Sequence, residues 1–134
     1  MELTELVERA RKARQNAYCP YSRYPVGAAL LAESGACYVG ANCENAAFGA
    51  GICAERAALA AAVTAGERRF TALAVVSSPP AGSEPATPCG ICRQMLAEFG
   101  EMTIICAGDG DVWRRTTLTA LLPAAFSPAH LTEI

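Results

Sequence analysis

Three cysteines in two short stretches of this chain have the spacing of a metal site. Cys89 and Cys92 stand three residues apart, which on a helix places both sulfur atoms on one face. Thr87 suits the N-cap and Pro88 the first helical position, so both thiols are expected in the first turn. Cys53 follows a glycine-containing loop and opens an alanine-rich run, so a second helix is expected to begin there. Three thiolates at helix N-termini would bind zinc and leave its fourth position open, as catalytic zinc sites do.

Glu55 is the candidate acid and base beside these cysteines. It stands two residues after Cys53, and side chains at the start of a helix lean back toward the N-terminus, so its carboxylate is expected to reach the open zinc position. Zinc lowers the pKa of a bound water to about 7 in favourable sites, and a nearby carboxylate can transfer the proton. The alternative is that this acidic residue only stabilises the helix, because a negative charge in the first turn interacts favourably with the helix dipole. The neighbouring cysteine motifs favour the catalytic role.

Such a site needs charge compensation, because one zinc ion and three thiolates leave a net negative charge that would raise the pKa of a bound water. The positive ends of two helices offset part of it. Arg56 follows Cys53 by three residues and Arg93 follows Cys89 by four, so each is expected beside a thiolate. For Arg56, a solvent-exposed surface position is the alternative.

Composition and charge favour a small substrate. The chain has 134 residues, which suits a single domain over 1–134, and 52% of them are hydrophobic. The formal net charge is −2 and no run of Lys and Arg occurs, which argues against a polynucleotide partner. No apolar run approaches the ~18 residues of a membrane span, and no export signal is visible. With an odd count of 7 cysteines, this predicts a reducing, cytoplasmic compartment.

Hydrophobic periodicity predicts helices alternating with strands. The pattern indicates helices over 2–17, 53–65, 89–99 and 118–122, and strands over 26–32, 36–41, 71–77, 102–107 and 112–116. This alternation implies an α/β fold, a three-layer α-β-α sandwich around a mixed sheet of about five strands.

The motifs together resemble the cytidine deaminases of the small, homotetrameric, zinc-dependent kind with three cysteine ligands. The resemblance runs nearly end to end and is carried by Cys53-Ala54-Glu55, Pro88-Cys89-Gly90-Ile91-Cys92-Arg93-Gln94, and the stretches 18–22, 25–30, 42–46 and 121–123. It implies a cytidine deaminase-like fold and hydrolytic deamination of cytidine and 2′-deoxycytidine to uridine and 2′-deoxyuridine plus ammonia, in pyrimidine salvage. Tyr24 stands where the family usually has Phe, Phe48 where Tyr is common, and the loop before Pro88 is slightly long.

Asn42 and Glu44 are the candidate sugar-binding residues. They alternate in an extended segment, so both side chains point the same way and can bind sugar hydroxyls. The alternative is a purely local Asx-type loop structure. By resemblance these positions hold the ribose, while the backbone N–H of Ala54 and the backbone C=O of Thr87 match positions that read the base.

Three aromatic residues are candidates to stack on the base. Phe126 is the first, and Tyr24 and Phe48 are the others, with ordinary core packing as the alternative for each. By resemblance, Arg56 hydrogen-bonds a ligand sulfur, and Phe126 reaches into the site of a neighbouring subunit. This implies a homotetramer with shared active sites and one zinc ion per chain.

Other functions remain open on the sequence. The Cys89-Gly90-Ile91-Cys92 stretch also fits a thiol–disulfide oxidoreductase, although that function leaves Cys53 and Glu55 unexplained. A structural zinc module would add Cys43 as a fourth ligand. A deaminase acting on RNA, DNA or an aminonucleoside antibiotic would share the catalytic residues, but the acidic balance and the Asn42/Glu44 pair favour plain nucleosides.

Overall fold

The chain folds around one five-stranded sheet. The computed structural model describes residues 1–110 and 113–131, so the predicted start of a strand at 112 and the tail residues 132–134 lie outside the described part. The elements are α1 (Leu3–Arg14), β1 (Gly27–Ala32), β2 (Cys37–Ala41), η1 (Phe48–Ala50), α2 (Ala54–Thr64), β3 (Phe70–Val76), α3 (Gly90–Ala97), β4 (Thr103–Ala107), β5 (Trp113–Thr117), α4 (Leu118–Leu121) and η2 (Pro128–Leu131).

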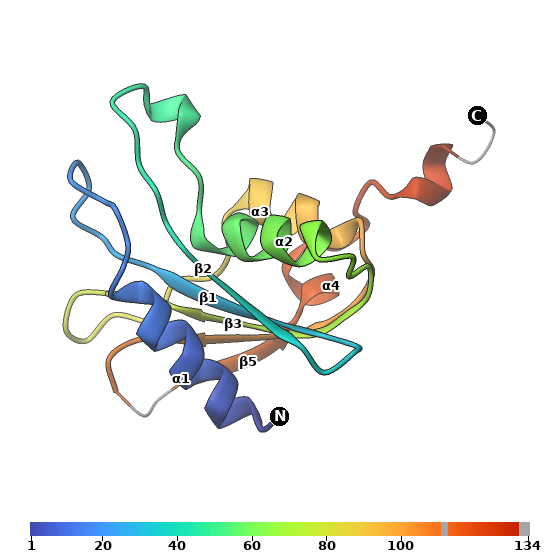
Figure 1. The fold of residues 1–134 in the computed structure, drawn as a ribbon, viewed down its shortest axis with the longest axis horizontal. Helices are drawn as coiled ribbons and strands as arrows, with labels where there is room; N and C mark the ends of the chain where they lie inside the picture. The colour runs from blue at the N-terminus through green and yellow to red at the C-terminus, as the bar shows by residue number, and fades with distance from the viewer. Residues whose placement is uncertain (111–112, 132–134) are drawn as a thin grey trace.

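The sheet is mixed, with the strand order β2-β1-β3-β4-β5. Only β3 and β4 pair in parallel, and the other three neighbouring pairs are antiparallel. Helix α1 covers one face, while α2, α3 and α4 lie on the other (Figure 1). The predicted three-layer sandwich and mixed sheet are therefore confirmed.

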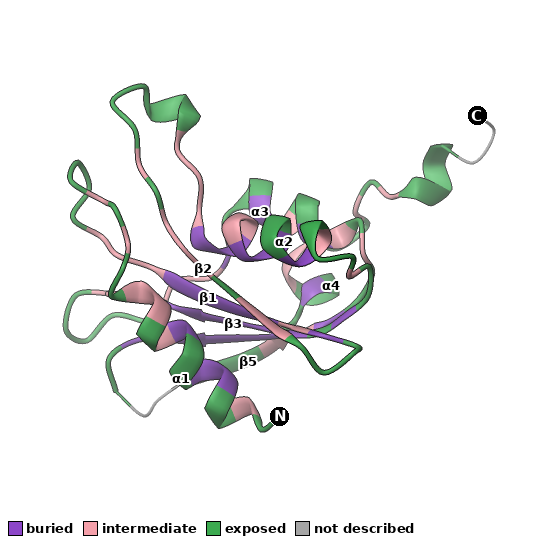
Figure 2. Cartoon of the chain, viewed as in Figure 1, coloured by how far each residue is buried: buried purple, intermediate pink, exposed green. Residues whose placement is uncertain are grey.

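Alternate side chains of the central strands pack into two apolar cores, one on each face of the sheet. The central strands are largely buried (Figure 2). Leu6, Val7 and Ala10 of α1 pack on one face against Ala29, Ala72, Ala74, Val76, Ile105 and Ala107. On the other face, α2, α3 and α4 contribute Ala58, Leu59, Leu96 and Leu118 to a cluster that includes Leu30, Leu73, Val75 and Ile104. No helix in the described ranges is long and apolar enough to cross a bilayer.

Helix α2 lies very close to the edge strand β2, and Gly40 makes this possible. A Cβ atom at Gly40 would lie 2.6 Å from the Ala54 carbonyl oxygen and 2.5 Å from the Ala58 nitrogen. Because no side chain fits there, the first turn of α2 rests directly on the sheet backbone. This packing fixes the turn that carries Glu55.

The predicted N-cap of α3 is wrong by two residues, although the predicted range of 89–99 begins only one residue before the helix. Cys89, not Thr87, is the N-cap, and Gly90, not Pro88, is the first helical residue. The Thr87 hydroxyl accepts a hydrogen bond from Arg93 Nη2 at 2.8 Å. It therefore binds a side chain of α3, whereas an N-cap hydroxyl would accept from a backbone N–H of the helix. The helix predicted over 2–17 is also shorter, because it spans Leu3–Arg14 and residues 15–16 form a turn.

Candidate active site

The N-termini of α2 and α3 bring three cysteine sulfurs together. Cys53 is the N-cap of α2, Cys89 is the N-cap of α3, and Cys92 follows in the first turn of α3. The Cys53 and Cys89 sulfurs lie 3.6 Å apart, those of Cys89 and Cys92 lie 3.5 Å apart, and all three lie within 4.8 Å of one another. The two motifs identified in the sequence thus form a single cluster, and each helix directs its positive end at it.

The cluster fits a tetrahedral zinc ion. Zinc–sulfur bonds of about 2.3 Å in tetrahedral geometry place neighbouring sulfurs about 3.8 Å apart, close to the spacing here. Cys43 does not belong to the group among the described residues, so the structure gives no support to a closed site of four cysteines. Three soft ligands with one position left open are the donor set of a catalytic zinc site.

Electrostatics within the cluster favour a thiolate at Cys53. Hydrogen bonding from the Cys92 thiol, together with the nearby Arg56 guanidinium, lowers the pKa of Cys53 to about 5, while the same hydrogen bond and burial raise the pKa of Cys92. Arg56 Nη2 lies 3.7 Å from the Cys53 sulfur. The structure therefore places Arg56 beside a thiolate, as the sequence predicted, and not on an open surface.

The guanidinium of Arg93 binds three oxygen acceptors. Its Nε donates to the Pro88 carbonyl at 2.6 Å, its Nη1 to the Leu121 carbonyl at 2.6 Å and its Nη2 to the Thr87 hydroxyl at 2.8 Å. Within the described part of the chain no hydrogen bond joins it to a cysteine sulfur. The guanidinium is held by the Pro88 and Leu121 carbonyls and the Thr87 hydroxyl, and a role for Arg93 in compensating the charge of the Cys89 thiolate stays a prediction.

Glu55 is buried at the wall of a cavity of about 540 Å³ next to the cysteines, with only 5% of its surface exposed. Burial raises the pKa of the Glu55 carboxyl, and the negative charge of Cys53 adds to the rise. A carboxyl that binds a proton more readily than usual, beside three cysteines that could hold a metal ion, is suited to proton transfer.

The cavity brings together most of the predicted site residues. Its walls include Tyr24, Asn42, Glu44, Phe48, Cys53, Ala54, Glu55, Arg56, Thr87 and Cys89. Sequence reasoning missed other wall residues, among them Ser22, Val26, Ile52, Val75, Ala86 and Ile91. For Ser22, Val26 and Ile91 a signal existed, since all three lie in stretches that carry the family resemblance. Ile52, Val75 and Ala86 are ordinary apolar residues without such a signal.

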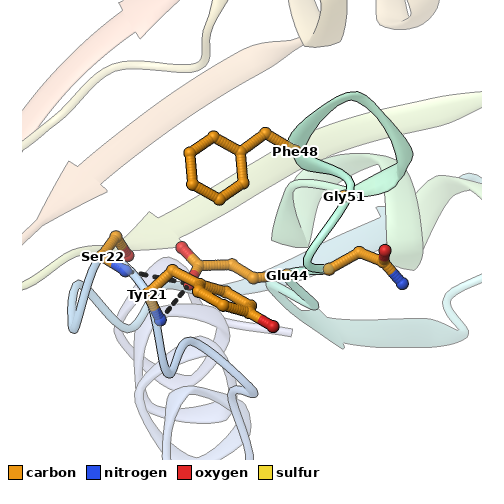
Figure 3. A pocket seen from close by; sticks show the side chains of 6 residues that line it. Tyr21, Ser22, Glu44, Phe48 and Gly51 are labelled. Carbon is orange, nitrogen blue, oxygen red and sulfur yellow. Dashed lines mark hydrogen bonds between the residues drawn. The ribbon is translucent and has the colours of Figure 1, made fainter.

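Glu44 follows β2, and its carboxylate contacts the loop 18–22. One of its carboxylate oxygens accepts hydrogen bonds from the backbone N–H of Tyr21 at 3.1 Å and of Ser22 at 3.0 Å (Figure 3). Hydrogen bonds from Ser22 lower the pKa of Glu44, so the carboxylate remains charged. A smaller hollow of about 280 Å³ adjoins this residue, between Tyr21, Phe48 and Gly51. The loop 18–22 therefore orients Glu44, a contact that sequence reasoning missed.

Asn42 binds the backbone on both sides of its amide group. Its Oδ1 accepts from the Val26 N–H and its Nδ2 donates to the Tyr24 carbonyl, both at 2.9 Å. Both partners are distant from Asn42 in the sequence, so Asn42 has a structural role, but this role is not the local Asx-type loop structure that the sequence left open. Since an amide oxygen has two lone pairs and an amide nitrogen two N–H groups, Asn42 retains capacity for a ligand.

Comparison with known proteins identifies the family. Residues 1–108 match the model of the "cytidine and deoxycytidylate deaminase zinc-binding region". The chain belongs to this deaminase family. It is 48% identical to the cytidine deaminase of Sporosarcina psychrophila, over 98% of this chain and 96% of that one, and 42% identical to that of Halalkalibacterium halodurans, over 99% and 100%.

Solved structures of cytidine deaminases share the fold. The crystal structure of the Burkholderia pseudomallei enzyme matches with a TM-score of 0.88 and 42% identity, over 94% of this chain and all of that one. The Mycobacterium tuberculosis enzyme matches with a TM-score of 0.79 and 41% identity, over 94% and 98%. The deaminase fold thus positions the cysteine cluster described above.

Two of the three candidate stacking rings in this deaminase family member are exposed in the single chain. Phe48 is 79% exposed and packs only loosely on Tyr21, with ring centroids 5.8 Å apart. Phe126 is 57% exposed, stacks on His130, and lies on a C-terminal segment that projects from the body of the fold (Figure 1). Phe126 is absent from the walls of its own chain's cavity. The alternative of ordinary core packing is therefore wrong for both residues.

Proposed function

We propose that this chain is a zinc-dependent cytidine deaminase that hydrolyses cytidine and 2′-deoxycytidine to uridine and 2′-deoxyuridine with release of ammonia. The observation that carries the proposal is the meeting of three cysteine sulfurs and one buried carboxyl, Glu55, at the wall of a single cavity. Family membership supports the same activity. Residues 1–134 would act as one catalytic domain.

In the proposed reaction, Cys53, Cys89 and Cys92 hold the zinc ion, and Arg56 offsets part of their charge. When bound, zinc would activate water for attack on the ring carbon that bears the amine. Glu55 accepts a proton from the attacking water and delivers it to the ring nitrogen N3. It then transfers a proton to the amine, which leaves as ammonia. Its burial keeps competing bulk water away from this proton.

Substrate contacts follow from the other cavity walls. Asn42 and Glu44 would bind the ribose hydroxyls, and the Ala54 N–H and Thr87 C=O would bind the base. Ala54 is the first residue of α2, so its N–H has no acceptor within the helix and is available to a ligand. Tyr24 and Phe48 would pack beside the nucleoside.

Cytidine and 2′-deoxycytidine are expected to be good substrates, whereas free cytosine and CMP are expected to be poor ones. Free cytosine forfeits the sugar contacts to Asn42 and Glu44. CMP adds a phosphate charge for which the cavity offers Arg56 alone among Lys and Arg side chains, and this one lies beside Cys53. The ultraviolet change that accompanies uracil formation measures each rate. Efficient turnover of CMP or of an oligonucleotide would contradict the assignment of substrate class.

The exposed tail supports an assembly in which sites are shared. We propose a homotetramer, acting in the cytoplasm in pyrimidine salvage, in which Phe126 of one subunit closes the cavity of another. The exposed ring of Phe126 and its distance from its own cavity wall support this. Gln94 Nε2 of α3 donates to the Phe126 carbonyl at 2.9 Å, so the tail is held where it leaves the body.

Phe126→Ala is expected to raise KM for cytidine roughly 5- to 150-fold, because base stacking is worth about 1–3 kcal/mol. Zinc content should not change. Leu131→Ala, which removes another exposed apolar side chain of the tail, is the matched control and should leave KM unchanged. Sedimentation should give a mass near that of four chains of 14.0 kDa. A fully active monomer would refute shared sites but not the zinc chemistry.

A further inference from the structure

Arg93 uses its whole guanidinium group to fix the chain around Thr87. Its Nη2 donates to the Thr87 hydroxyl and its Nε donates to the carbonyl of Pro88, the next residue. Its Nη1 donates to the Leu121 carbonyl at the end of α4, which holds the guanidinium from the other side. A planar group with five N–H donors can serve three acceptors at once, and a lysine cannot reproduce that geometry.

The chain is also fixed immediately before Thr87. Ser77 follows β3 and is fully buried, and its hydroxyl oxygen accepts a hydrogen bond from the Ala86 N–H at 3.0 Å. Ser77 is itself held, because its N–H donates to the Ala107 carbonyl at 2.9 Å and its carbonyl accepts from Arg14 Nη1 at 2.7 Å. We call Ser77 and Arg93 the Thr87 clamp, since they hold the residues on either side of Thr87.

The carbonyl between these two anchors is left without a partner of its own. Among the hydrogen bonds of the described residues, none ends on the Thr87 carbonyl oxygen, and Pro88 has no N–H that could bind nearby. Thr87 is half-buried at the wall of the cavity that holds Glu55 and the cysteines. A rigid, unpaired carbonyl at that wall is an acceptor prepared for the amino group of a ligand.

We infer that Arg93 is a positioning residue for the substrate base, acting through the Thr87 hydroxyl, with Ser77 as the second half of the clamp. The inference rests on the proposed function, because it takes the amine of the cytosine ring as the group that the Thr87 carbonyl binds. It gives Arg93 a different role from Arg56: Arg56 acts on the metal ligands, whereas Arg93 acts on the base. Zinc binding should therefore survive the loss of Arg93's contacts.

A double-mutant cycle separates this role from general structural support. Arg93→Lys and Thr87→Val each remove the bond between the guanidinium and the hydroxyl, and each is expected to raise KM for cytidine about 10-fold with full zinc content. If Arg93 acts through the hydroxyl, the double variant should lose clearly less than the product of the two single losses. Arg68→Lys is the matched control, because Arg68 also donates to two backbone carbonyls, those of Val63 and Glu67, far from the cavity, and its KM should not change.

Several results would overturn the inference. Losses that multiply in the double variant would show that Arg93 and Thr87 act independently. An Arg93→Lys protein that loses zinc, or that loses only thermal stability at unchanged KM, would show that Arg93 supports α3 and not the base. A parent protein that does not deaminate cytidine would overturn the proposed function and this inference together. If the parent protein is active but the two single losses multiply in the double variant, only this inference is overturned.

Discussion

Glu55→Gln is expected to keep its zinc and to bind cytidine, while kcat falls roughly 10²–10⁴-fold. Glutamine has the size of glutamate, so the packing of this residue, which is 5% exposed in the first turn of α2, is preserved. The amide cannot accept and return a proton, so both the activation of water and the protonation of the ring lose their carrier. Metal analysis, equilibrium binding of cytidine and steady-state kinetics measure the three quantities.

The matched control for this change is Glu33→Gln. Glu33 is an exposed glutamate in the turn between β1 and β2, and the same substitution there should leave zinc, binding and kcat unchanged. A Glu55→Gln protein that lost its zinc would show that Glu55 is a metal ligand. One that kept its full rate would remove Glu55 from the proton transfer altogether.

The zinc cluster was predictable because its geometry is local. The spacing of Cys89 and Cys92, and of Cys53 and Glu55, places each pair within a single helical turn, where residue spacing determines direction. What joins the pairs is that β2 and β3 both run antiparallel to β1, so the strands that precede α2 and α3 end at the same edge of the sheet. The layers of the sandwich were predictable for the same reason, since apolar periodicity marks which face each element buries.

The contacts that sequence reasoning did not anticipate are those of Arg93 and Thr87, and one of them joins residues that are distant in the sequence. Arg93 was expected beside Cys89, but one of its acceptors is the carbonyl of Leu121, 28 positions further along the chain. Thr87 was expected to cap α3, but its hydroxyl is taken by Arg93, so the helix begins at Cys89 as N-cap. No local sequence pattern specifies that the guanidinium of Arg93 will donate to carbonyl oxygens and not to a thiolate. This choice depends on how α4 meets α3, which is a tertiary contact.

The exposed aromatics mark a different limit. Phe48 and Phe126 are apolar rings that the single chain does not cover, and their surroundings are determined by whatever packs on them. Sequence reasoning found them through the family resemblance, because periodicity alone would assign such rings to a core. The exposure of Phe48 and Phe126 argues against core packing and is consistent with a stacking role.

Cys89→Ala is expected to lose zinc and deaminase activity together, with activity falling at least as far as in Glu55→Gln. The Cys89 sulfur lies 3.6 Å from that of Cys53 and 3.5 Å from that of Cys92, so it is the member of the cluster that bridges the two helices. Without it, two sulfurs remain, and two protein ligands are fewer than the three of a catalytic zinc site. Because bound metal stabilises the folded state, the melting temperature should also fall toward that of the chelator-treated parent protein.

Cys37→Ala is the matched control for this loss. Cys37 lies on β2 and packs in the core beneath α1, on the opposite face of the sheet from α2 and α3. Its replacement removes a thiol of the same kind but should leave zinc at about one ion per chain and the rate unchanged. A Cys89→Ala protein that retained full zinc and full rate would show that the metal is held elsewhere. Loss of zinc from Cys37→Ala as well would mean that metal content follows the stability of the fold and not the three sulfurs at the helix N-termini.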